Sequence, residues 1–107
     1  MKPQQQFEII YTRVLASHLA AIERKYHSLI RSTIEDQLSY EPEVKTRNRK
    51  PLRPYSQLGA TWELRLGARN EFRVFYETNS ATYEVYILAI GIKIGNQLFI
   101  AGEKVEL

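Results

Sequence analysis

The chain has 107 residues, of which 44% are hydrophobic and 25% charged, and its formal net charge is +3. This length and composition are typical of one globular domain and exclude a disordered chain, so we expect residues 1–107 to form a single domain. Because the chain has no cysteine, a disulfide framework and a zinc-thiolate site are excluded, and His18 and His27 alone make a poor metal site. We therefore expect neither a metal nor another cofactor.

The sequence also predicts where the protein resides. It contains no run of about 18 apolar residues, the length that crosses a membrane, and its first residues lack the apolar core of a signal peptide. The absence of cysteine is compatible with a reducing compartment. We expect a cytoplasmic protein with no membrane partner.

The first part of the chain predicts a short strand followed by two helices. Residues Phe7–Tyr11 form an apolar run suited to an edge strand. The charged stretch Glu23–His27 then interrupts a helical pattern, so we expect two helices or one bent helix, with an end by Tyr40 ahead of Pro42. The apolar stripe of this pattern recurs every three or four residues, at Leu15, Leu19, Ile22, Tyr26, Ile30, Ile34 and Leu38.

The segment Glu41–Ala60 is predicted to be an extended loop, because it contains three prolines and Gly59. A long ordered loop in a small domain usually serves a function. Part of the loop is basic with no acidic residue, which concentrates positive potential and suits a nucleic-acid partner; the alternative is a solvated loop with no ligand. The basic residues are Lys45, Arg47, Arg49, Lys50 and Arg53.

An antiparallel meander of strands is predicted to follow. The three strands are Thr61–Leu66, Glu71–Thr78 and Thr82–Ile92, with a possible fourth at Gln97–Ala101 and an exposed tail after it. The third strand is expected to be central because it is apolar on both faces. Its two expected faces carry Tyr83, Val85, Ile87 and Ala89 on one side and Tyr86, Leu88 and Ile90 on the other. The fold class is therefore α+β, with a two-helix hairpin packed on a small antiparallel β-sheet.

Two arginines are predicted to lie together on the sheet face that the helices leave open. Successive side chains of a strand point to opposite faces, so Glu63 and Arg65 face away from the apolar side chains of their strand. The same alternation places Arg73 away from the main apolar face of the next strand. Paired guanidinium groups suit a phosphate ligand; the alternative is that both are solvated surface charges.

The order of these segments resembles the RelE/ParE superfamily of toxins from type II toxin–antitoxin systems. The resemblance covers nearly the whole chain. It is carried by the helices ending in LSYEP and then by KPLR (Lys50–Arg53), WELR (Trp62–Arg65), FRVFY (Phe72–Tyr76) and AIGIK (Ala89–Lys93). It implies a RelE-like fold and a toxin that a cognate antitoxin holds inactive, with operator DNA bound only through the complex of the two.

Within this superfamily the resemblance leaves three functions open. RelE-like members cleave messenger RNA in the ribosomal A site without a metal, so the partners would be the ribosome and mRNA. ParE-like members instead inhibit DNA gyrase without enzymatic chemistry. A third reading is a member that has lost catalysis and binds only its antitoxin.

The resemblance also implies roles for particular residues. Arg73 matches the arginine that contacts the scissile phosphate. Arg65 lies on the same face, and Lys93 stands where the family often has an arginine. The implied catalytic residues are Arg73, Arg65, Lys50 and Lys93, and the implied RNA-binding residues are Lys45, Arg47, Arg49, Arg53 and Arg69.

One position departs from the family pattern. RelE-like enzymes often have a tyrosine or histidine where this chain has Phe99, and phenylalanine transfers no proton. Glu63, at the family's position for a catalytic lysine, and Tyr76 are the candidate acid or base residues in its place.

Overall fold

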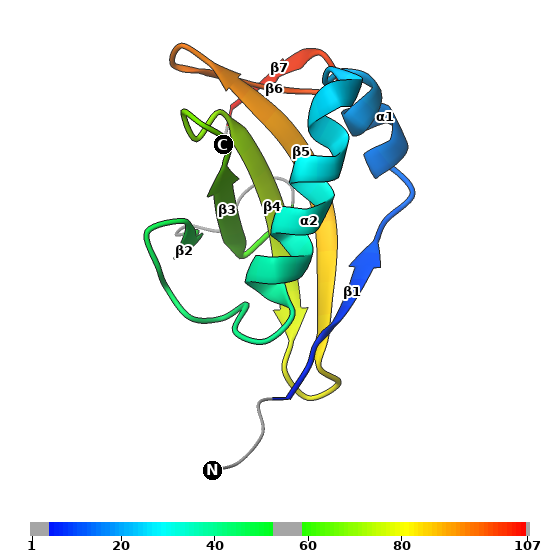
Figure 1. The fold of residues 1–107 in the computed structure, drawn as a ribbon, viewed down its shortest axis with the longest axis vertical. Helices are drawn as coiled ribbons and strands as arrows, with labels where there is room; N and C mark the ends of the chain where they lie inside the picture. Colours follow the sequence, from blue (N-terminus) through cyan, green and yellow to red (C-terminus); the bar gives the residue numbers. More distant parts are fainter. Residues whose placement is uncertain (1–4, 53–58, 107) are drawn as a thin grey trace.

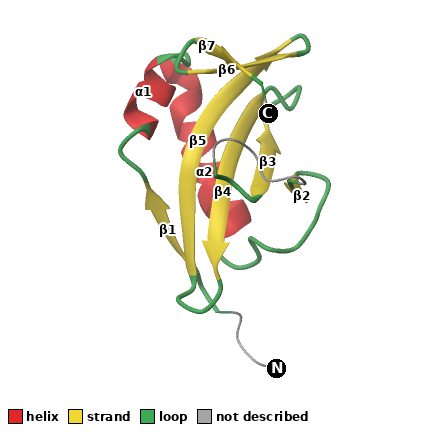
Figure 2. Ribbon diagram, turned by 180° about the vertical axis from the view of Figure 1, so that it is seen from behind, coloured by secondary structure: helices red, strands yellow, loops and turns green. Residues whose placement is uncertain are grey.

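The computed structural model describes residues 5–52 and 59–106, in which a seven-stranded sheet carries two helices on one face (Figures 1 and 2). The sheet order is β2-β3-β4-β5-β6-β7, and β1 pairs with β5 in parallel. The strands are β1 (Glu8–Tyr11), β2 (Arg49–Pro51), β3 (Trp62–Leu66), β4 (Phe72–Asn79), β5 (Glu84–Ile94), β6 (Gln97–Ile100) and β7 (Glu103–Val105). The helices are α1 (Leu15–Ala20) and α2 (His27–Leu38), separated by a 3₁₀ turn at Arg24–Tyr26. The predicted α+β class, the helix break and the antiparallel meander are confirmed.

Two short strands lie where the sequence predicted none. Arg49–Pro51 pairs with β3 inside the segment predicted to be a loop. Glu103–Val105 pairs with β6, so the tail predicted to be an exposed end is part of the sheet. The turn before β7 has positive φ at both Ala101 and Gly102 (54° and 80°), the geometry of a tight hairpin. Strands of three residues are too short to show an alternating pattern, which explains why the sequence did not predict them.

The main core lies between the helices and the sheet. Ile30, Ile34 and Leu38 of α2 are at most 1% exposed, which confirms the predicted helical stripe. They pack against the inner face of the meander, and burial of each such side chain contributes roughly 1.5–3 kcal/mol. The sheet residues of this core are Leu64, Leu66, Phe72, Val74, Tyr76, Val85, Ile87 and Ile90.

A β-bulge in β5 changes which side chains face the helices. In the pairing of β4 with β5, Phe75 lies opposite Ala89 and Tyr76 opposite Ile87, so Leu88 is an extra residue. Ile90 therefore joins the helix-facing core, and Ala89 packs on the other face with Phe75. The predicted division of this strand, with Ala89 beside Ile87, was wrong because simple alternation does not include a bulge.

Gly91 allows β6 to cross closely over β5. A Cβ atom at this position would lie 2.7 Å from the carbonyl oxygen of Phe99, nearer than real Cβ atoms come to backbone. The close approach brings Leu98 and Ile100 of β6 onto Phe75, where they form a second, smaller core. The β6–β7 hairpin thus folds over one end of the face opposite the helices (Figure 2).

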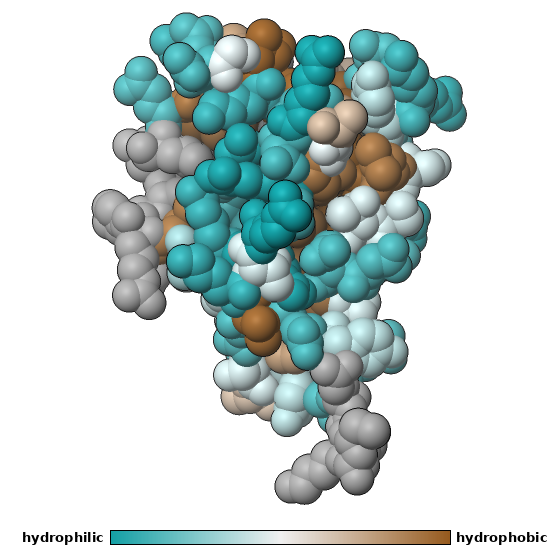
Figure 3. Space-filling view, turned by 60° about the vertical axis from the view of Figure 1, so that its left-hand side comes forward, coloured by the Kyte–Doolittle hydropathy of each residue, from teal (hydrophilic) through white to brown (hydrophobic). Residues whose placement is uncertain are grey.

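Hydrophilic side chains cover most of the side shown in Figure 3, and hydrophobic ones gather there in small groups. Ile94 (60% exposed) and Val14 (52%) are the most exposed large hydrophobic residues among those described. None of the described helices is long and apolar enough to cross a membrane.

Two side-chain hydrogen bonds fasten the chain around α1 to the edge of β5. Thr12 Oγ1 donates to the carbonyl oxygen of Ile87 at 2.8 Å. Beyond the bulge, the backbone N–H of Ile90 donates to Nδ1 of His18 at 3.1 Å. Nδ1 accepts this bond only when it carries no proton, and burial lowers the pKa of His18 below its ordinary value of 6.5.

This contact predicts an acid-sensitive loss of stability. Because the pKa of His18 is lower in the folded state, the unfolded chain takes up the proton first, so stability is full above about pH 6.5 and falls below it. In denaturant titrations at about pH 7.5 and about pH 5, wild type should lose more free energy of unfolding than His18→Asn, whose amide oxygen accepts without titrating. Equal losses in the two proteins would contradict this role of His18.

Candidate anion-binding site

The pairing of β3 with β4 places two arginines directly opposite each other. Arg65 is the register partner of Arg73, and both side chains leave the sheet on the face opposite the helices, as predicted. Like charges in directly opposed positions of two strands repel and destabilise the pair. This placement requires a compensating anion.

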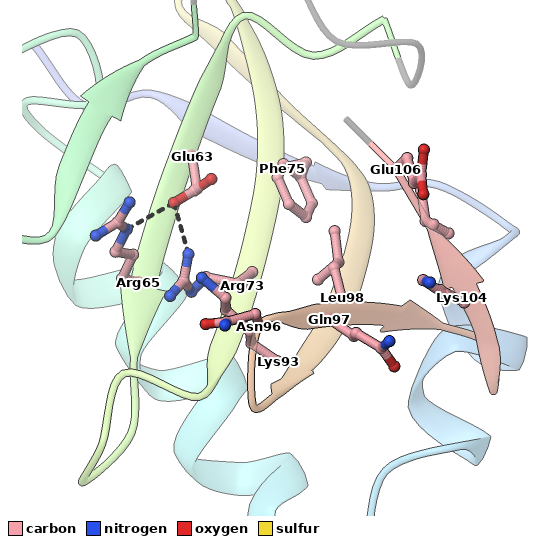
Figure 4. Close-up of a pocket in the computed structure, with 11 residues that line it drawn as sticks. Glu63, Arg65, Arg73, Phe75, Lys93, Asn96, Gln97, Leu98, Lys104 and Glu106 are labelled. Atoms are coloured by element: carbon pink, nitrogen blue, oxygen red, sulfur yellow. Dashed lines mark hydrogen bonds and ion pairs between the residues drawn. The ribbon is translucent and has the colours of Figure 1, made fainter.

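Glu63 supplies that anion (Figure 4). Its Oε1 atom accepts hydrogen bonds from Arg65 Nε at 2.7 Å and from Arg73 Nη1 at 3.2 Å. The Glu63 side chain is 5% exposed, whereas that of Arg65 is 33% exposed. One buried carboxylate therefore holds both guanidinium groups through charge-assisted hydrogen bonds, which are stronger than bonds between neutral groups.

The turn between the two strands fixes Arg73 a second time. Arg73 Nε donates to the carbonyl oxygen of Asn70 at 3.0 Å. Asn70 has a φ of 53°, a left-handed conformation that asparagine tolerates better than most residues. Its N–H donates to the carbonyl oxygen of Gly67 at 3.1 Å, which closes the turn. The pKa of Arg73 lies below its ordinary value, because burial and the nearby charge of Arg65 lower it more than Glu63 raises it. Arg73 still remains a cation at neutral pH.

These residues form one wall of an open cleft of about 690 Å³. The cleft continues along β5 and under the β6–β7 hairpin, so four cationic side chains share it with two carboxylates. A concave surface of this charge attracts anions, and paired guanidinium groups match the geometry of a phosphate. Its lining includes Glu63, Arg65, Arg73, Lys93, Lys104 and Glu106.

Several predicted site residues lie at or near this cleft. Arg73, Arg65, Glu63 and Lys93 line it together. Lys50 is the register partner of Glu63 on β2, so it lies on the same face of the sheet, beside the cleft lining. Arg69 is exposed and lines a neighbouring hollow of about 500 Å³ that also includes Arg73 and Lys93.

Other predicted residues lie elsewhere. Lys45 and Arg47 are exposed in the loop before β2 and are not part of the described lining of this cleft. Arg49 is only 7% exposed, and its guanidinium Nη1 donates to the carbonyl oxygen of Gln37 in α2, so it faces the helices rather than a ligand. Arg53 is outside the described residues.

Tyr76 belongs to the main core. It is fully buried on the helix-facing side, and its hydroxyl donates to the carbonyl oxygen of Pro42 at 2.7 Å. Burial raises the pKa of Tyr76 well above its ordinary value. A hydroxyl so placed cannot exchange protons with a ligand in the cleft.

Phe99 does not face the cleft either. Its neighbours Leu98 and Ile100 pack on the cleft side of the sheet, so alternation directs Phe99 to the opposite side of β6. Within the described lining, Gln97, Asn96, Lys104 and Glu106 are the polar groups that the sequence did not predict. The signal for Lys104 and Glu106 was absent because they lie in or directly after β7, a strand that the pattern did not show. Among the described residues, no cluster of three or more His, Cys, Asp or Glu side chains forms a metal site.

Comparison with known proteins supports the fold. Neither a scan against protein-family models nor a search of curated proteins gives a match. Among solved structures, a chain of the toxin–antitoxin complex RelBE2 from Mycobacterium tuberculosis is similar, with 22% sequence identity and a TM-score of 0.63. The alignment covers 82% of this chain and 99% of that chain. At this identity the likeness establishes a shared fold, which confirms the predicted RelE-like architecture.

The arginine pair predicts a salt-sensitive stability defect on loss of its carboxylate. Glu63→Ala should lower the free energy of unfolding by about 1–3 kcal/mol, because it removes two charge-assisted hydrogen bonds and leaves Arg65 opposed to Arg73. The defect should shrink in about 0.5 M salt, which screens the repulsion. Urea titrations measure both values, with the exposed Glu103→Ala as control. A loss of free energy of unfolding no larger than that of the control would refute the stabilising role of the contacts between Glu63 and the two arginines.

Proposed function

We propose that the chain is the toxin of a type II toxin–antitoxin pair and acts as a metal-independent endoribonuclease that cleaves messenger RNA on the ribosome. The observation that carries this proposal is the pair of guanidinium groups, held by one carboxylate, on the wall of an open cleft. The fold shared with a chain of a toxin–antitoxin complex supports the toxin assignment. Its expected place of action is the cytoplasm.

The cleft supplies the charge stabilisation that such a reaction needs. The ribose 2′-oxygen loses its proton and bonds to the adjacent phosphorus, the bond to the leaving 5′-oxygen breaks, and that oxygen takes up a proton. Negative charge grows on the non-bridging oxygens in the transition state, where Arg73 and Arg65 would donate hydrogen bonds. Both arginines keep Nη donors that no described residue engages.

The proton carriers would come from the cleft or from the ribosome. The groups of the cleft that can exchange protons are Glu63, Glu106, Lys93 and Lys104. Lys50, across from Glu63, would help to position the RNA backbone, and Arg69 would contact a neighbouring phosphate. Tyr76 and Arg49 have no part in this proposal because both face the helices.

An antitoxin would bind on the opposite side of the molecule. A hollow of about 430 Å³ lies between the helices and β1, and its lining is mainly apolar, including Leu15, Leu19 and Ile34. Arg13 and Arg31 also line it, so an amphipathic peptide with acidic residues would match its chemistry. We expect operator DNA to be bound only through the toxin–antitoxin complex.

A second candidate function is inhibition of DNA gyrase without enzymatic chemistry. It is favoured by the absence of tyrosine and histidine from the described lining of the cleft, since Phe99 and Tyr76 both point away from it. A protein that retains only antitoxin binding is the remaining alternative.

Expression in cells distinguishes these functions. Induction of wild type should produce codon-phased breaks in messenger RNA, detected by mapping of RNA ends, and Arg73→Ala should reduce their frequency by about 100-fold or more. The control is Arg24→Ala, an exposed arginine beside the helices, which should cut like wild type. Intact messages with double-strand breaks in DNA would refute the nuclease and support the gyrase inhibitor. Growth without any defect would support the antitoxin-binding alternative.

A further inference from the structure

The Glu63 carboxylate lies between two guanidinium groups that face the cleft. Its Oε1 atom holds Arg65 and Arg73 at 2.7 and 3.2 Å, and its side chain is only 5% exposed. In the described part of the chain, Oε2 of Glu63 has no donor, and both Nη atoms of Arg65 and Nη2 of Arg73 have no acceptor. An anion that binds here would share the arginines with a carboxylate already in place.

The arrangement sets the charge of the arginine wall. Two guanidinium cations and one carboxylate in direct contact leave a single net positive charge there. Lys93 and Lys104 line the rest of the cleft, where Glu106 offsets part of their charge. At the two arginines themselves, the single net positive charge is balanced by a ligand group with one negative charge.

Phosphate groups of nucleic acids differ in this charge. An internal phosphodiester carries one negative charge, whereas a terminal phosphate monoester approaches two above a pH of about 6. One negative charge balances the arginine wall. A second would lie close to the buried carboxylate of Glu63, in surroundings where like charges repel more strongly than in water.

We propose that Glu63 is a specificity-determining residue, which admits an internal phosphodiester of single-stranded RNA to the cleft and disfavours a terminal phosphate monoester. A built-in repulsive group is a common source of such selectivity. That the ligand is RNA rests on the proposed function, but discrimination between the two phosphate classes is a property of the cleft alone. The protein would thus bind within RNA strands rather than at their phosphorylated ends.

A binding experiment with two small probes tests this inference. The probes are the 2′-O-methyl dinucleotide UpU, with one phosphodiester and no reactive hydroxyl, and 2′-O-methyluridine 3′-phosphate, with one monoester. NMR titration of the full chain gives both dissociation constants. At about pH 8 wild type should prefer the diester about tenfold, and Glu63→Gln should reduce this preference about fivefold or more.

The pH dependence of wild type provides a second test that needs no variant. At about pH 5 the monoester carries mostly one charge, so the preference of wild type should fall toward that of Glu63→Gln. If Glu63→Gln does not fold, a wild-type preference that stays unchanged at about pH 5 would still overturn the inference. The control is Glu103→Gln, an exposed carboxylate of β7 that is not part of the described lining of the cleft, which should keep the wild-type preference at about pH 8.

Three further results would overturn the inference: an unchanged preference in Glu63→Gln, equal binding of both probes by wild type at about pH 8, or no shift of cleft resonances with either probe. The outcome is separable from that of the proposed function. Discrimination between the probes without cuts in messenger RNA would refute the nuclease alone. Cuts in messenger RNA without discrimination would refute the role of Glu63 alone.

Discussion

Arg65 and Arg73 lie directly opposite each other on β3 and β4, and the cleft on this face of the sheet depends on that placement. Two cations in register repel, so the strands carry them only because the buried carboxylate of Glu63 binds both. The same contacts fix the two guanidinium groups in position before any ligand arrives. A structural requirement of the sheet thus becomes a preorganised anion site, in which little side-chain entropy remains to be lost on binding.

The shape of the cleft depends on two irregularities of β5. The bulge at Leu88 sends Ile90 to the helix-facing core and Ala89 to the opposite face, so one long strand serves two cores. Gly91, the register partner of Arg73, has no side chain, and β6 crosses closely at that point. The crossing carries Lys104 and Glu106 to the side of the cleft that faces the arginines. A regular strand would leave an open sheet face instead.

Much of the fold and part of the site were predictable from the sequence. Strand alternation placed Arg65 and Arg73 on the open face because β3 and β4 are regular. The same reasoning failed for Arg49, since membership of a basic cluster says nothing about register: pairing opposite Leu64 turns its side chain toward α2. Contacts made by Lys104 were unpredictable because a three-residue strand has no detectable pattern. To predict that Glu63 binds both arginines, one would have needed the pairing register of β3 and β4 as well as the alternation of side chains.

The most direct test of the account is a crystal structure of the protein with a non-cleavable 2′-O-methyl trinucleotide. We expect one internal phosphate in the cleft, with its oxygens at about 2.7–3.0 Å from Nη atoms of Arg65 and Arg73. Glu63 should still bind both arginines in that complex. A trinucleotide held by the Lys45 and Arg47 loop, with the arginine cleft empty, would contradict the central claim that this cleft is the phosphate site.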